Sequence, residues 1–416
     1  MKLLTATWDK PNSWALETYK ASGGYTALPK ALKMQPQQIV DEVVKSNLRG
    51  RGGAGFPTGM KWTFVRKETS FPKYLVVNAD EGEPGTFKDR EILLKSPHLF
   101  VEGLVIGCYA VECHQTYIYC RGEFRESAMK RLQTAIDEAY EQGYLGKNIL
   151  RSGFDLEAHC VYGAGAYICG EETGMLESIE GRKGYPRLKP PFPANAGGGL
   201  FKQPTAVNNV ETLANMPPII NLGADEYAKI GLVPKNGGTR LYAVSGHVKR
   251  PGVYEAPMGI SFRKLLDDHC GGMREGSTLK AIIPGGASSA IITAEEADWA
   301  SDFDTLKAKK TMAGSGAVVY LDQSVNMAHA LANVMRFFAH ESCGQCTPCR
   351  EGTAWLSRLL DKIVAGKGAK IDVDNVHQIA RQMEMKTICA LADGAAMPAK
   401  SYIEKFRADF DALVRG

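Results

Sequence analysis

Three cysteines at a spacing of three residues lie near the C-terminus, and a fourth follows in a separate segment. They are Cys343, Cys346 and Cys349 in ESCGQCTPCREG, and Cys389 in TICALADGAA. Three thiolates on one short loop and a fourth from a distant segment suit a [4Fe–4S] cluster. Structural zinc also accepts four cysteines, but more often from two C-x-x-C pairs, and it remains the alternative.

The residues beside these cysteines predict that two helices begin there. Thr347 and Pro348 have the types of a helix N-cap and first helical residue, and Thr387 is placed to cap a helix from Ile388. Both helix N-termini would then direct their positive ends at the thiolates.

The other six cysteines have no ligand spacing. The N-terminus, MKLLTATWDK, has no long apolar segment and predicts no secretory signal, which favours a reducing compartment. We therefore expect buried free thiols at Cys108, Cys113, Cys120, Cys160, Cys169 and Cys270.

A glycine-rich stretch, GRGGAGFPTGMKW, contains the spacing G-x-G-x-x-G. In a dinucleotide-binding fold this fingerprint follows a strand, but the preceding PQQIVDEVVKSNL has apolar residues at helical spacing. The stretch therefore fails as that fingerprint. Its bare backbone amides still suit a phosphate, with Lys61 adding charge, and a tight turn is the alternative. The amides are those of Gly50, Arg51, Gly52, Gly53 and Gly55.

Acidic and amide side chains recur in three further motifs. Carboxylates at a strand's carboxyl end accept hydrogen bonds from ribityl or ribose hydroxyls, and an acid there favours NAD over NADP; a solvated acidic turn is the alternative. Phe56, Phe64 and Phe192 can stack on nicotinamide or adenine, although each alone is more often part of a core. The motifs supply Asn78, Asp80, Glu81 and Glu83 in NADEGEPG, Tyr167, Gly170, Glu171 and Glu172 in YICGEETG, and Asn208, Asn209 and Thr212 in NNVET.

The elements that must position these residues alternate between strand and helix. KYLVVNAD, QTYIYCRG and DLEAHCVYGAGAYICGEE predict strands, separated by helices over about 89–112 and over EFRESAMKRLQTAIDEAYEQ. Phe124, Ala128, Leu132, Ile136 and Tyr140 lie on one side of that second helix. The order implies an α/β fold with a parallel, doubly wound sheet whose ligands lie at the carboxyl ends of the strands.

The rest of the chain changes character twice. Residues 184–218, rich in proline, glycine and asparagine, predict a long functional loop. Short strands and turns from 239 to about 324 predict a small α+β domain, and helices follow from Val325. A net charge of +4 over 416 residues does not favour binding to nucleic acid or to a membrane surface. No apolar run approaches the roughly 20 residues that a membrane span needs.

Seven motifs together resemble the NADH-binding F subunit of NADH-quinone oxidoreductase, respiratory complex I. They occur in the family's order over nearly the whole chain: GRGGAGFPTGMKW, NADEGEPGTFKDR, YICGEET, PRLKPPFP, NNVETLAN, ESCGQCTPCREG and TICALADGAA. The resemblance implies a Rossmann-like FMN/NADH-binding domain over 1–235, a β-grasp-like (ubiquitin-like) domain over 236–324 and a helical [4Fe–4S] domain over 325–416. The segment ANAGGGLFKQPT departs from the family pattern by its length and glycine content.

The same resemblance assigns roles to the motif residues. FMN would contact Gly50, Arg51, Gly52, Gly53, Lys61, Asn78, Asp80, Gly170, Glu171, Asn208, Asn209 and Thr212. NADH would be framed by Phe56, Phe64, Glu81, Glu83, Tyr167, Glu172, Lys189 and Phe192. The cluster ligands fall on Cys343, Cys346, Cys349 and Cys389.

The resemblance also implies the reaction. NADH would give a hydride to FMN, and single electrons would leave through the cluster. No side chain need act as acid, base or nucleophile, so Glu81, Glu83 and Glu172 would only position the substrate. The expected partners are complex I subunits E, with a [2Fe–2S] cluster, and G, with several clusters. The chain would be cytoplasmic, or peripheral to the inner face of the cell membrane through those partners.

Three other functions remain open. A diaphorase subunit of an NAD-linked hydrogenase or formate dehydrogenase would share the chemistry, but some hydrogenase relatives carry thioredoxin-like or ferredoxin domains that this sequence lacks. A non-enzymatic nucleotide-binding module with structural zinc is a different class. A cluster-bearing nucleic-acid protein would need a basic stripe, which the balanced charge does not favour.

Overall fold

The computed structural model describes residues 2–415, which divide into two compact units. The first contains the chain up to Gly82, Phe87–Tyr242 and Val253–Gly259; the second contains Glu83–Thr86, Ala243–Gly252 and the chain from Ile260 onward. The three-domain division expected from the sequence stays a prediction.

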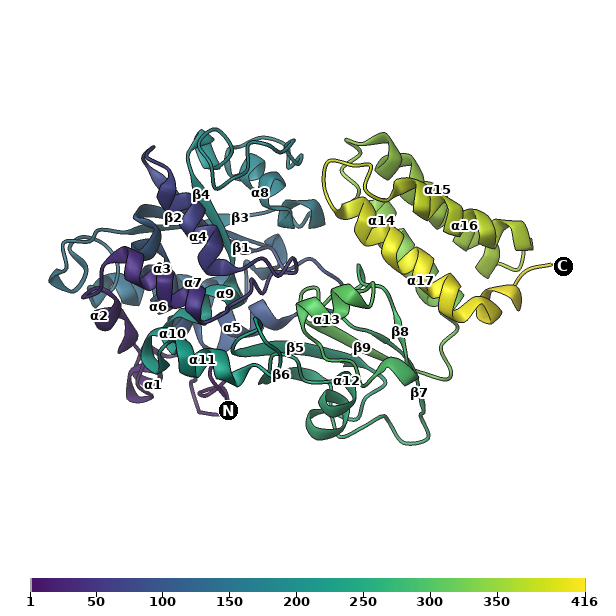
Figure 1. Ribbon diagram of the computed structural model, residues 1–416, viewed down its shortest axis with the longest axis horizontal. Helices are drawn as coiled ribbons and strands as arrows, with labels where there is room; N and C mark the ends of the chain where they lie inside the picture. Colours follow the sequence, from purple (N-terminus) through teal and green to yellow (C-terminus); the bar gives the residue numbers. More distant parts are fainter. Residues whose placement is uncertain (1, 416) are drawn as a thin grey trace. The chain divides into compact units, whose positions relative to one another are not determined.

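A parallel four-stranded sheet forms the centre of the first unit (Figure 1). Its strands are β1 (Lys73–Ala79), β2 (Cys113–Cys120), β3 (Glu157–Tyr162) and β4 (Thr205–Asn209), in the order β3-β2-β1-β4. All three strand pairs are parallel, as the alternation of strands and helices predicts. The sequence did not predict β4, which lies within the segment expected to be a loop.

Eleven α-helices lie among the described residues of the first unit. Among them α6 is buried along nearly its whole length and packs against β1 and β2. The helices are α1 (Leu16–Ala21), α2 (Ala27–Ala31), α3 (Pro36–Lys45), α4 (Thr58–Lys67), α5 (Lys88–Lys95), α6 (Pro97–Val111), α7 (Ala128–Glu141), α8 (Glu172–Ile179), α9 (Val210–Ala214), α10 (Met216–Leu222) and α11 (Ala224–Ile230).

Two helix predictions in this unit need correction. The single helix expected over 89–112 is two helices, α5 and α6, which meet at an angle of 101° because Pro97 cannot continue a helix. Similarly, α7 begins only at Ala128, after a short 3₁₀ turn over Gly122–Phe124. Tyr140 is not on the buried side of α7: its ring is partly exposed and its hydroxyl accepts a hydrogen bond from the Ala158 amide.

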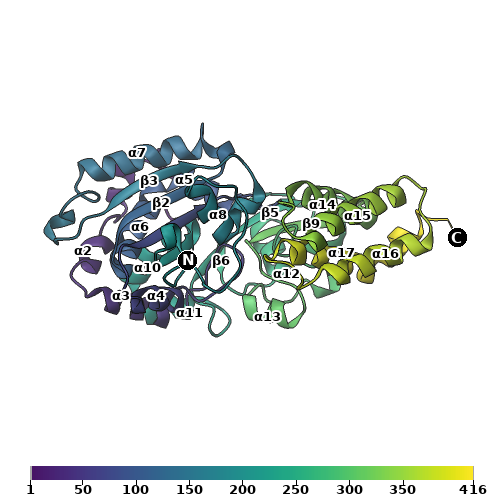
Figure 2. The ribbon, with the colours of Figure 1, turned by 90° about the horizontal axis from the view of Figure 1, so that it is seen from above.

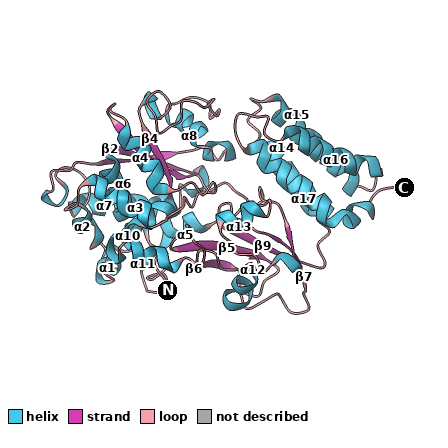
Figure 3. Cartoon of the chain, viewed as in Figure 1, coloured by secondary structure: helices cyan, strands magenta, loops and turns pink. Residues whose placement is uncertain are grey.

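A mixed five-stranded sheet has the order β6-β5-β9-β7-β8 (Figure 3). Strand β9 pairs in parallel with β5 and antiparallel with β7. The strands are β5 (Thr239–Gly246), β6 (Gly252–Pro257), β7 (Leu279–Ile283), β8 (Ile292–Thr293) and β9 (Ala317–Asp322), and the short helices α12 (Phe262–Lys264) and α13 (Phe303–Ala308) lie between them in the chain.

Four long helices complete the second unit and run side by side in both views (Figures 1 and 2). They are α14 (Met327–Glu341), α15 (Thr347–Val364), α16 (Lys370–Met383) and α17 (Leu391–Asp411). The helical C-terminal region predicted from Val325 is present. Among the described residues no single helix has both the length and the apolarity of a membrane span; only the bent α5–α6 pair meets both criteria together.

A buried carboxylate on α6 fixes the N-terminal segment. Glu102 is almost fully buried, and its oxygens accept hydrogen bonds from the amides of Tyr25, Ala27 and Leu28 at 2.8–2.9 Å. The hydroxyl of Tyr19 donates to the same carboxylate. Glu102 therefore satisfies the amides that open α2, which has no side-chain cap of its own.

Glu102→Leu should destabilise the protein by about 3 kcal/mol or more, since it leaves several buried donors without an acceptor. Denaturant unfolding followed by circular dichroism measures this change. Glu141→Leu, at an exposed position on α7, is the control and should change the free energy of unfolding by less than about 0.5 kcal/mol. Equal effects of the two substitutions would contradict the anchoring role of Glu102.

Candidate functional site

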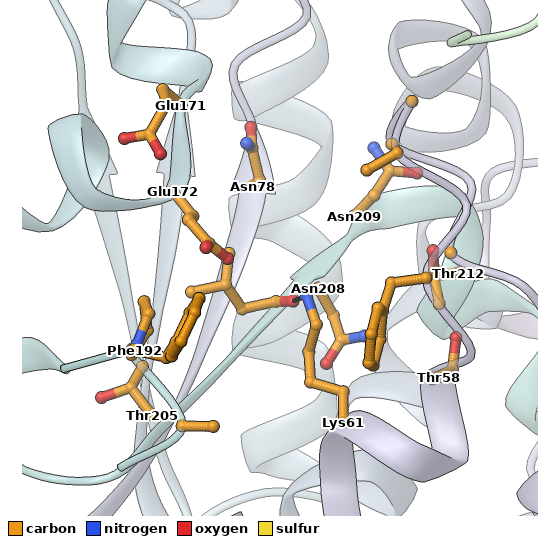
Figure 4. A pocket seen from close by; sticks show the side chains of 18 of the residues that line it. Thr58, Lys61, Asn78, Glu171, Glu172, Phe192, Thr205, Asn208, Asn209 and Thr212 are labelled. Atoms are coloured by element: carbon orange, nitrogen blue, oxygen red, sulfur yellow. Dashed lines mark hydrogen bonds between the residues drawn. The ribbon is translucent and has the colours of Figure 1, made fainter. Parts of the chain in front are cut away.

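A cleft of about 810 Å³ lies in the first unit, beside the carboxyl ends of β1 and β4 (Figure 4). This is where ligands bind in open parallel sheets. It brings together most of the residues predicted from the sequence: Gly50, Gly52, Gly53, Phe56, Lys61, Phe64, Asn78, Gly170, Glu171, Glu172, Lys189, Phe192, Asn208, Asn209 and Thr212.

Several lining residues were not predicted as site residues. Thr205 and Val207 belong to β4, which was not expected as a strand, and Pro193, Ala194 and Asn195 come from the proline-rich loop. Ala54 and Thr58 complete the glycine loop and the start of α4, while Gly55, whose amide the sequence predicted for a phosphate, also lines the cleft. A threonine at the first position of a helix that follows a glycine loop is a signal that could have identified Thr58.

Five predicted residues lie outside the lining, and Arg51 is the most deeply placed of them. Its side chain is fully buried, and its guanidinium donates to the carbonyls of Gly237 and Thr239, both at 2.9 Å. The Arg51 amide donates to the Thr212 hydroxyl at 2.9 Å. The Arg51 side chain therefore anchors the glycine loop to Gly237 and Thr239 and does not line the cleft. Its amide already has an acceptor in Thr212.

The two glutamates of NADEGEPG make different contacts. Glu81 accepts hydrogen bonds from the amides of Asp89 and Arg90, at 2.8 and 3.0 Å, in the first turn of α5. Burial raises the pKa of Glu81 to about 7, and the neighbouring Asp89 adds to the shift. Glu83 belongs to the second unit, where it accepts from the amide and the hydroxyl of Ser288, both at 2.7 Å.

Asp80 and Tyr167 are the remaining two residues outside the lining. The Asp80 amide donates to the side chain of Asn78 at 3.0 Å. Tyr167 opens the 3₁₀ turn Tyr167–Gly170, and a Cβ at Gly82 would lie 3.1 Å from its ring. Asp80 therefore lies in the loop directly after β1, and the Tyr167 ring lies against the same loop.

One end of the cleft is built from backbone and hydroxyl groups. The amide of Gly52 donates no hydrogen bond within residues 2–415. A Cβ at this position would lie 3.1 Å from the Cβ of Asn209, so only glycine fits without displacing that side chain. Thr58 and Thr212 lie one above the other at the same end (Figure 4). The donors at this end suit an anion such as a phosphate.

The asparagines of NNVET are held in place by other side chains. Asn208 accepts a hydrogen bond from the indole of Trp62 at 2.9 Å. Asn209 donates to Asp89 at 2.6 Å and accepts from the Lys88 ammonium at 3.3 Å. Both amides thus enter the cleft in fixed orientations.

Charged side chains gather toward the other end. The Lys189 ammonium lies 2.7 Å from Glu172 and 3.1 Å from Glu171, while Lys61 donates to the carbonyl of Val207 at 3.1 Å. Burial lowers the pKa of Lys61. Burial alone would raise the pKa of Glu172, yet Lys61 and Lys189 hold that pKa below its usual value. Both signs of charge are therefore present at neutral pH.

Three phenylalanines line the cleft with exposed rings. Phe56, Phe64 and Phe192 are 41%, 42% and 53% exposed, and the rings of Phe56 and Phe64 lie 6.4 Å apart between centroids. Aromatic rings left open beside a cleft suit a planar ligand that stacks on them. None of the three is part of the buried core.

The four predicted cluster ligands come from two segments that contact each other. Cys346 accepts a hydrogen bond from the Ile388 amide at 3.4 Å, next to Cys389. The Cys349 thiol lies 3.2 Å from the hydroxyl of Ser342. Burial raises the pKa of Cys349, and Cys343 and Cys346 are close enough to raise it further. Among residues 2–415, no three cysteine, histidine or acidic side chains form a group that could hold one metal ion.

The predicted caps beside these cysteines are wrong by one to a few residues. Cys346 itself is the N-cap of α15, so Thr347 is the first helical residue and Pro348 the second. Helix α17 begins only at Leu391, and the Thr387 hydroxyl instead donates to the carbonyl of Cys389 at 2.9 Å. Helix α15 therefore still begins beside Cys346, one of the predicted cluster ligands.

Within residues 2–415, none of the six remaining cysteines forms a disulfide. Cys108, Cys113, Cys120, Cys169 and Cys270 are buried, whereas Cys160 is partly exposed.

Three family models match successive parts of the chain. The Nuo51 FMN-binding domain matches residues 43–218, the SLBB domain matches 240–321, and the NADH-ubiquinone oxidoreductase-F iron-sulfur binding region matches 329–413. An NADH-quinone oxidoreductase F subunit of Rhizobium meliloti (strain 1021) is 51% identical over 98% of this chain and 96% of its own length. The chain belongs to the family of NADH-quinone oxidoreductase F subunits.

A second curated relative supports this membership, and one solved structure has the same fold. The NADH-quinone oxidoreductase F subunit of Streptomyces coelicolor is 49% identical, over all of this chain and 91% of the relative. A solved structure, the NAD⁺-reducing [NiFe]-hydrogenase in the H₂-reduced state, aligns with a TM-score of 0.86 at 32% identity, covering all of this chain and 67% of the hydrogenase chain.

The family confirms the predicted fold class, cofactors and enzyme class. The chain has an FMN-binding domain and a [4Fe–4S] region, and it is an NADH-oxidising flavoprotein subunit of an oxidoreductase with several subunits. The individual site residues stay predictions.

Gly52→Val should weaken FMN binding by at least about 10-fold before it unfolds the protein. The new side chain would press on Asn209, which Lys88 and Asp89 hold in place. Flavin fluorescence titration and thermal unfolding measure the two effects separately. Unchanged FMN affinity would contradict the placement of the phosphate at this loop.

Glu81→Gln should reduce the pH dependence of stability. The folded protein holds a proton on Glu81 up to about pH 7, above the ordinary pKa of about 4.5, so the free energy of unfolding falls as pH rises between these values. Between pH 5 and pH 8, the free energy of unfolding should therefore fall by about 2 kcal/mol less in the variant than in the wild type. Chemical unfolding at both pH values measures it.

Glu275→Gln, at an exposed position, should keep the wild-type pH dependence. If Glu81→Gln also kept it, the perturbed titration of Glu81 would be refuted.

Proposed function

We propose that the chain binds FMN in the cleft of the first unit and oxidises NADH there, passing electrons through a [4Fe–4S] cluster to partner subunits. The observation that carries the proposal is the division of the cleft into an end of backbone and hydroxyl donors and an end of charged and aromatic side chains. A flavin mononucleotide has the same division, with a phosphate at one end and a planar ring at the other.

The residues present fit FMN. Gly52 and Thr58 offer donors without partners among residues 2–415, and Asn208, Asn209 and Thr212 offer side chains along the cleft. When bound, FMN supplies the chemistry, since it accepts a hydride and gives up electrons singly. The protein binds and orients the flavin at the carboxyl ends of β1 and β4.

NADH recognition is assigned to the exposed end of the cleft. Phe56, Phe64 and Phe192 would stack on the planar groups, and Lys189 would meet the negative charge of the dinucleotide. Glu172, which is ionised at neutral pH, would accept hydrogen bonds from ribose hydroxyls. No side chain is required to move a proton.

The cysteine donor set fits an iron–sulfur cluster. Cys343, Cys346 and Cys349 lie on one loop, and the segment of Cys389 contacts Cys346 through the Ile388 amide. The N-terminus of α15 starts at Cys346 and would stabilise thiolate charge. These four cysteines are the proposed ligands.

The expected partners are the complex I subunits E and G, and the chain would lie at the inner face of the cell membrane through them. The rival is the diaphorase subunit of an NAD-linked hydrogenase, supported by the alignment with the NAD⁺-reducing [NiFe]-hydrogenase; the corresponding subunit of a formate dehydrogenase would have the same chemistry. Co-purification from the source organism separates them. Recovery with a [NiFe] or formate-oxidising subunit would overturn the complex I assignment.

Protein purified without oxygen should contain FMN and iron in a ratio of about one to four. NADH should bleach the flavin absorbance and support ferricyanide reduction. A colourless protein with zinc, or one with both cofactors that does not react with NADH, would refute the proposed function.

Cys389→Ser is the matched variant for the cluster. It should lose most of the iron while it keeps FMN and the NADH-dependent bleaching of the flavin, because Cys389 does not line the cleft. Unchanged iron content would remove Cys389 from the ligand set.

A further inference from the structure

One arginine binds the two ends of the proline-rich loop that carries Lys189 and Phe192 to the cleft. Through Nη1 the guanidinium of Arg187 donates to the carbonyls of Gly198 and Gly199, both at 3.0 Å. Arg187 itself does not line the cleft. Its side chain therefore joins the start of the loop to a segment that begins 11 residues further along the chain.

Acidic side chains at the end of α8 bind the other nitrogens of this guanidinium. Nη2 donates to Glu180 at 2.9 Å, and Nε donates to Glu177. The second oxygen of Glu180 accepts a hydrogen bond from the Phe201 amide at 2.7 Å, so Glu180 also holds the far segment of the loop. Hydrogen bonds from Arg182 and Arg187 lower the pKa of Glu177 to about 2. The loop is therefore fixed to α8 by charge-assisted hydrogen bonds at neutral pH.

The glycines of this segment let it lie directly against the backbone beside Phe192. A Cβ at Gly198 would lie 2.2 Å from the Phe192 carbonyl oxygen, and a Cβ at Gly199 would lie 2.7 Å from the Pro193 carbonyl oxygen. The Thr205 amide on β4 donates to the same Pro193 carbonyl at 2.8 Å. The glycine-rich stretch that departs from the family pattern is therefore the backbone against which Phe192 packs.

The backbone around Phe192 has little freedom to absorb a displacement. Pro190, Pro191 and Pro193 each have a φ angle that the proline ring fixes. Because Gly198 lies against the Phe192 carbonyl, a change in the position of Gly198 also moves Phe192.

We propose that Arg187 is a positioning residue for NADH, which sets the place of Phe192 in the cleft by binding the carbonyls of Gly198 and Gly199. The inference rests on the proposed function, which assigns Phe192 and Lys189 to NADH recognition. Arg187 moves no proton and no electron, and it acts only through the loop. Without its side chain, the loop must be ordered at each binding event, so NADH binds more weakly.

Arg182 provides a matched control for Arg187. Both arginines pair with Glu177 and Glu180, but the side chain of Arg182 is 56% exposed and contacts no loop carbonyl within residues 2–415. Arg182→Leu therefore removes an arginine from the same two acids and leaves the contacts of the loop intact.

The test measures KM and kcat in the FMN-loaded protein, together with the Kd of tetrahydro-NADH, an analogue that cannot give a hydride. Arg187→Leu should raise KM and this Kd by about 10-fold or more, with kcat within about 3-fold of wild type and FMN content unchanged. Arg182→Leu should change none of these values by more than about 2-fold. If Arg187→Leu does not fold, Arg187→Lys gives the same comparison with a smaller rise in KM, since an ammonium cannot bind both acids and both carbonyls at once.

A double-mutant cycle tests whether Arg187 acts through Phe192. If it does, adding Arg187→Leu to Phe192→Ala should raise the Kd of tetrahydro-NADH by less than about 3-fold beyond Phe192→Ala alone. Fully additive effects would overturn this part of the inference.

Three further results would overturn the inference. They are an unchanged KM in Arg187→Leu, equal effects of Arg182→Leu and Arg187→Leu, and a loss of FMN together with NADH affinity, which would show a general structural role. A wild-type protein that holds FMN but binds no tetrahydro-NADH would instead refute the proposed function.

Discussion

The shape of the cleft in the first unit depends on the glycine loop, whose two ends are joined by hydrogen bonds. The Gly50 amide donates to the carbonyl of Phe56, and the Thr58 amide donates to the carbonyl of Leu48. These two backbone hydrogen bonds join the start of the loop to its end. Arg49 donates to the carbonyl of Gly55 inside the same loop. Because the ends are fixed, the residues between them keep a stable shape while the Gly52 amide stays free. Because the loop is already ordered, a ligand that binds to its amides loses less free energy to the ordering of the backbone.

A buried ionic network connects Asn209, which lines the cleft, to the rest of the first unit. The Lys88 ammonium lies 2.8 Å from Asp89 and 2.8 Å from Glu211, and all three side chains are buried. Asn209 joins the network through Asp89, and Glu211 accepts from the Leu241 amide at 2.8 Å. Buried charges persist only when they are paired in this manner. The network therefore connects Asn209 to α5 and, through Glu211, to β5. These contacts limit how far the Asn209 side chain can move.

Hydrophobic periodicity and the alternation of strands with helices predicted the parallel sheet and the helix before the glycine loop, because both can be read from short segments. The motifs and the family resemblance predicted most of the cleft lining. Strand β4 was missed since its residues Thr205–Asn209 follow a proline- and glycine-rich segment, and only pairing with β1 identifies them as a strand. The break at Pro97 was missed because the apolar periodicity continues through it. The helix starts near Thr347 and Thr387 were misplaced because capping depends on the backbone conformation of the cysteine loop, which residue type alone does not give.

The positions of Glu81 and Glu83 demonstrate a different limit. They are two residues apart and were given the same role, yet Glu81 is held by the first turn of α5 and Glu83 by Ser288. Thr58 demonstrates the reverse: nothing in its type distinguishes it from Thr63, but one hydroxyl finds a carbonyl within its own helix and the other finds none. The residue type determines which hydrogen bonds a side chain can make, but only the fold determines which of them are formed within the protein. Buried donors without a partner, such as the Thr58 hydroxyl, can therefore be found from the structure and not from the sequence.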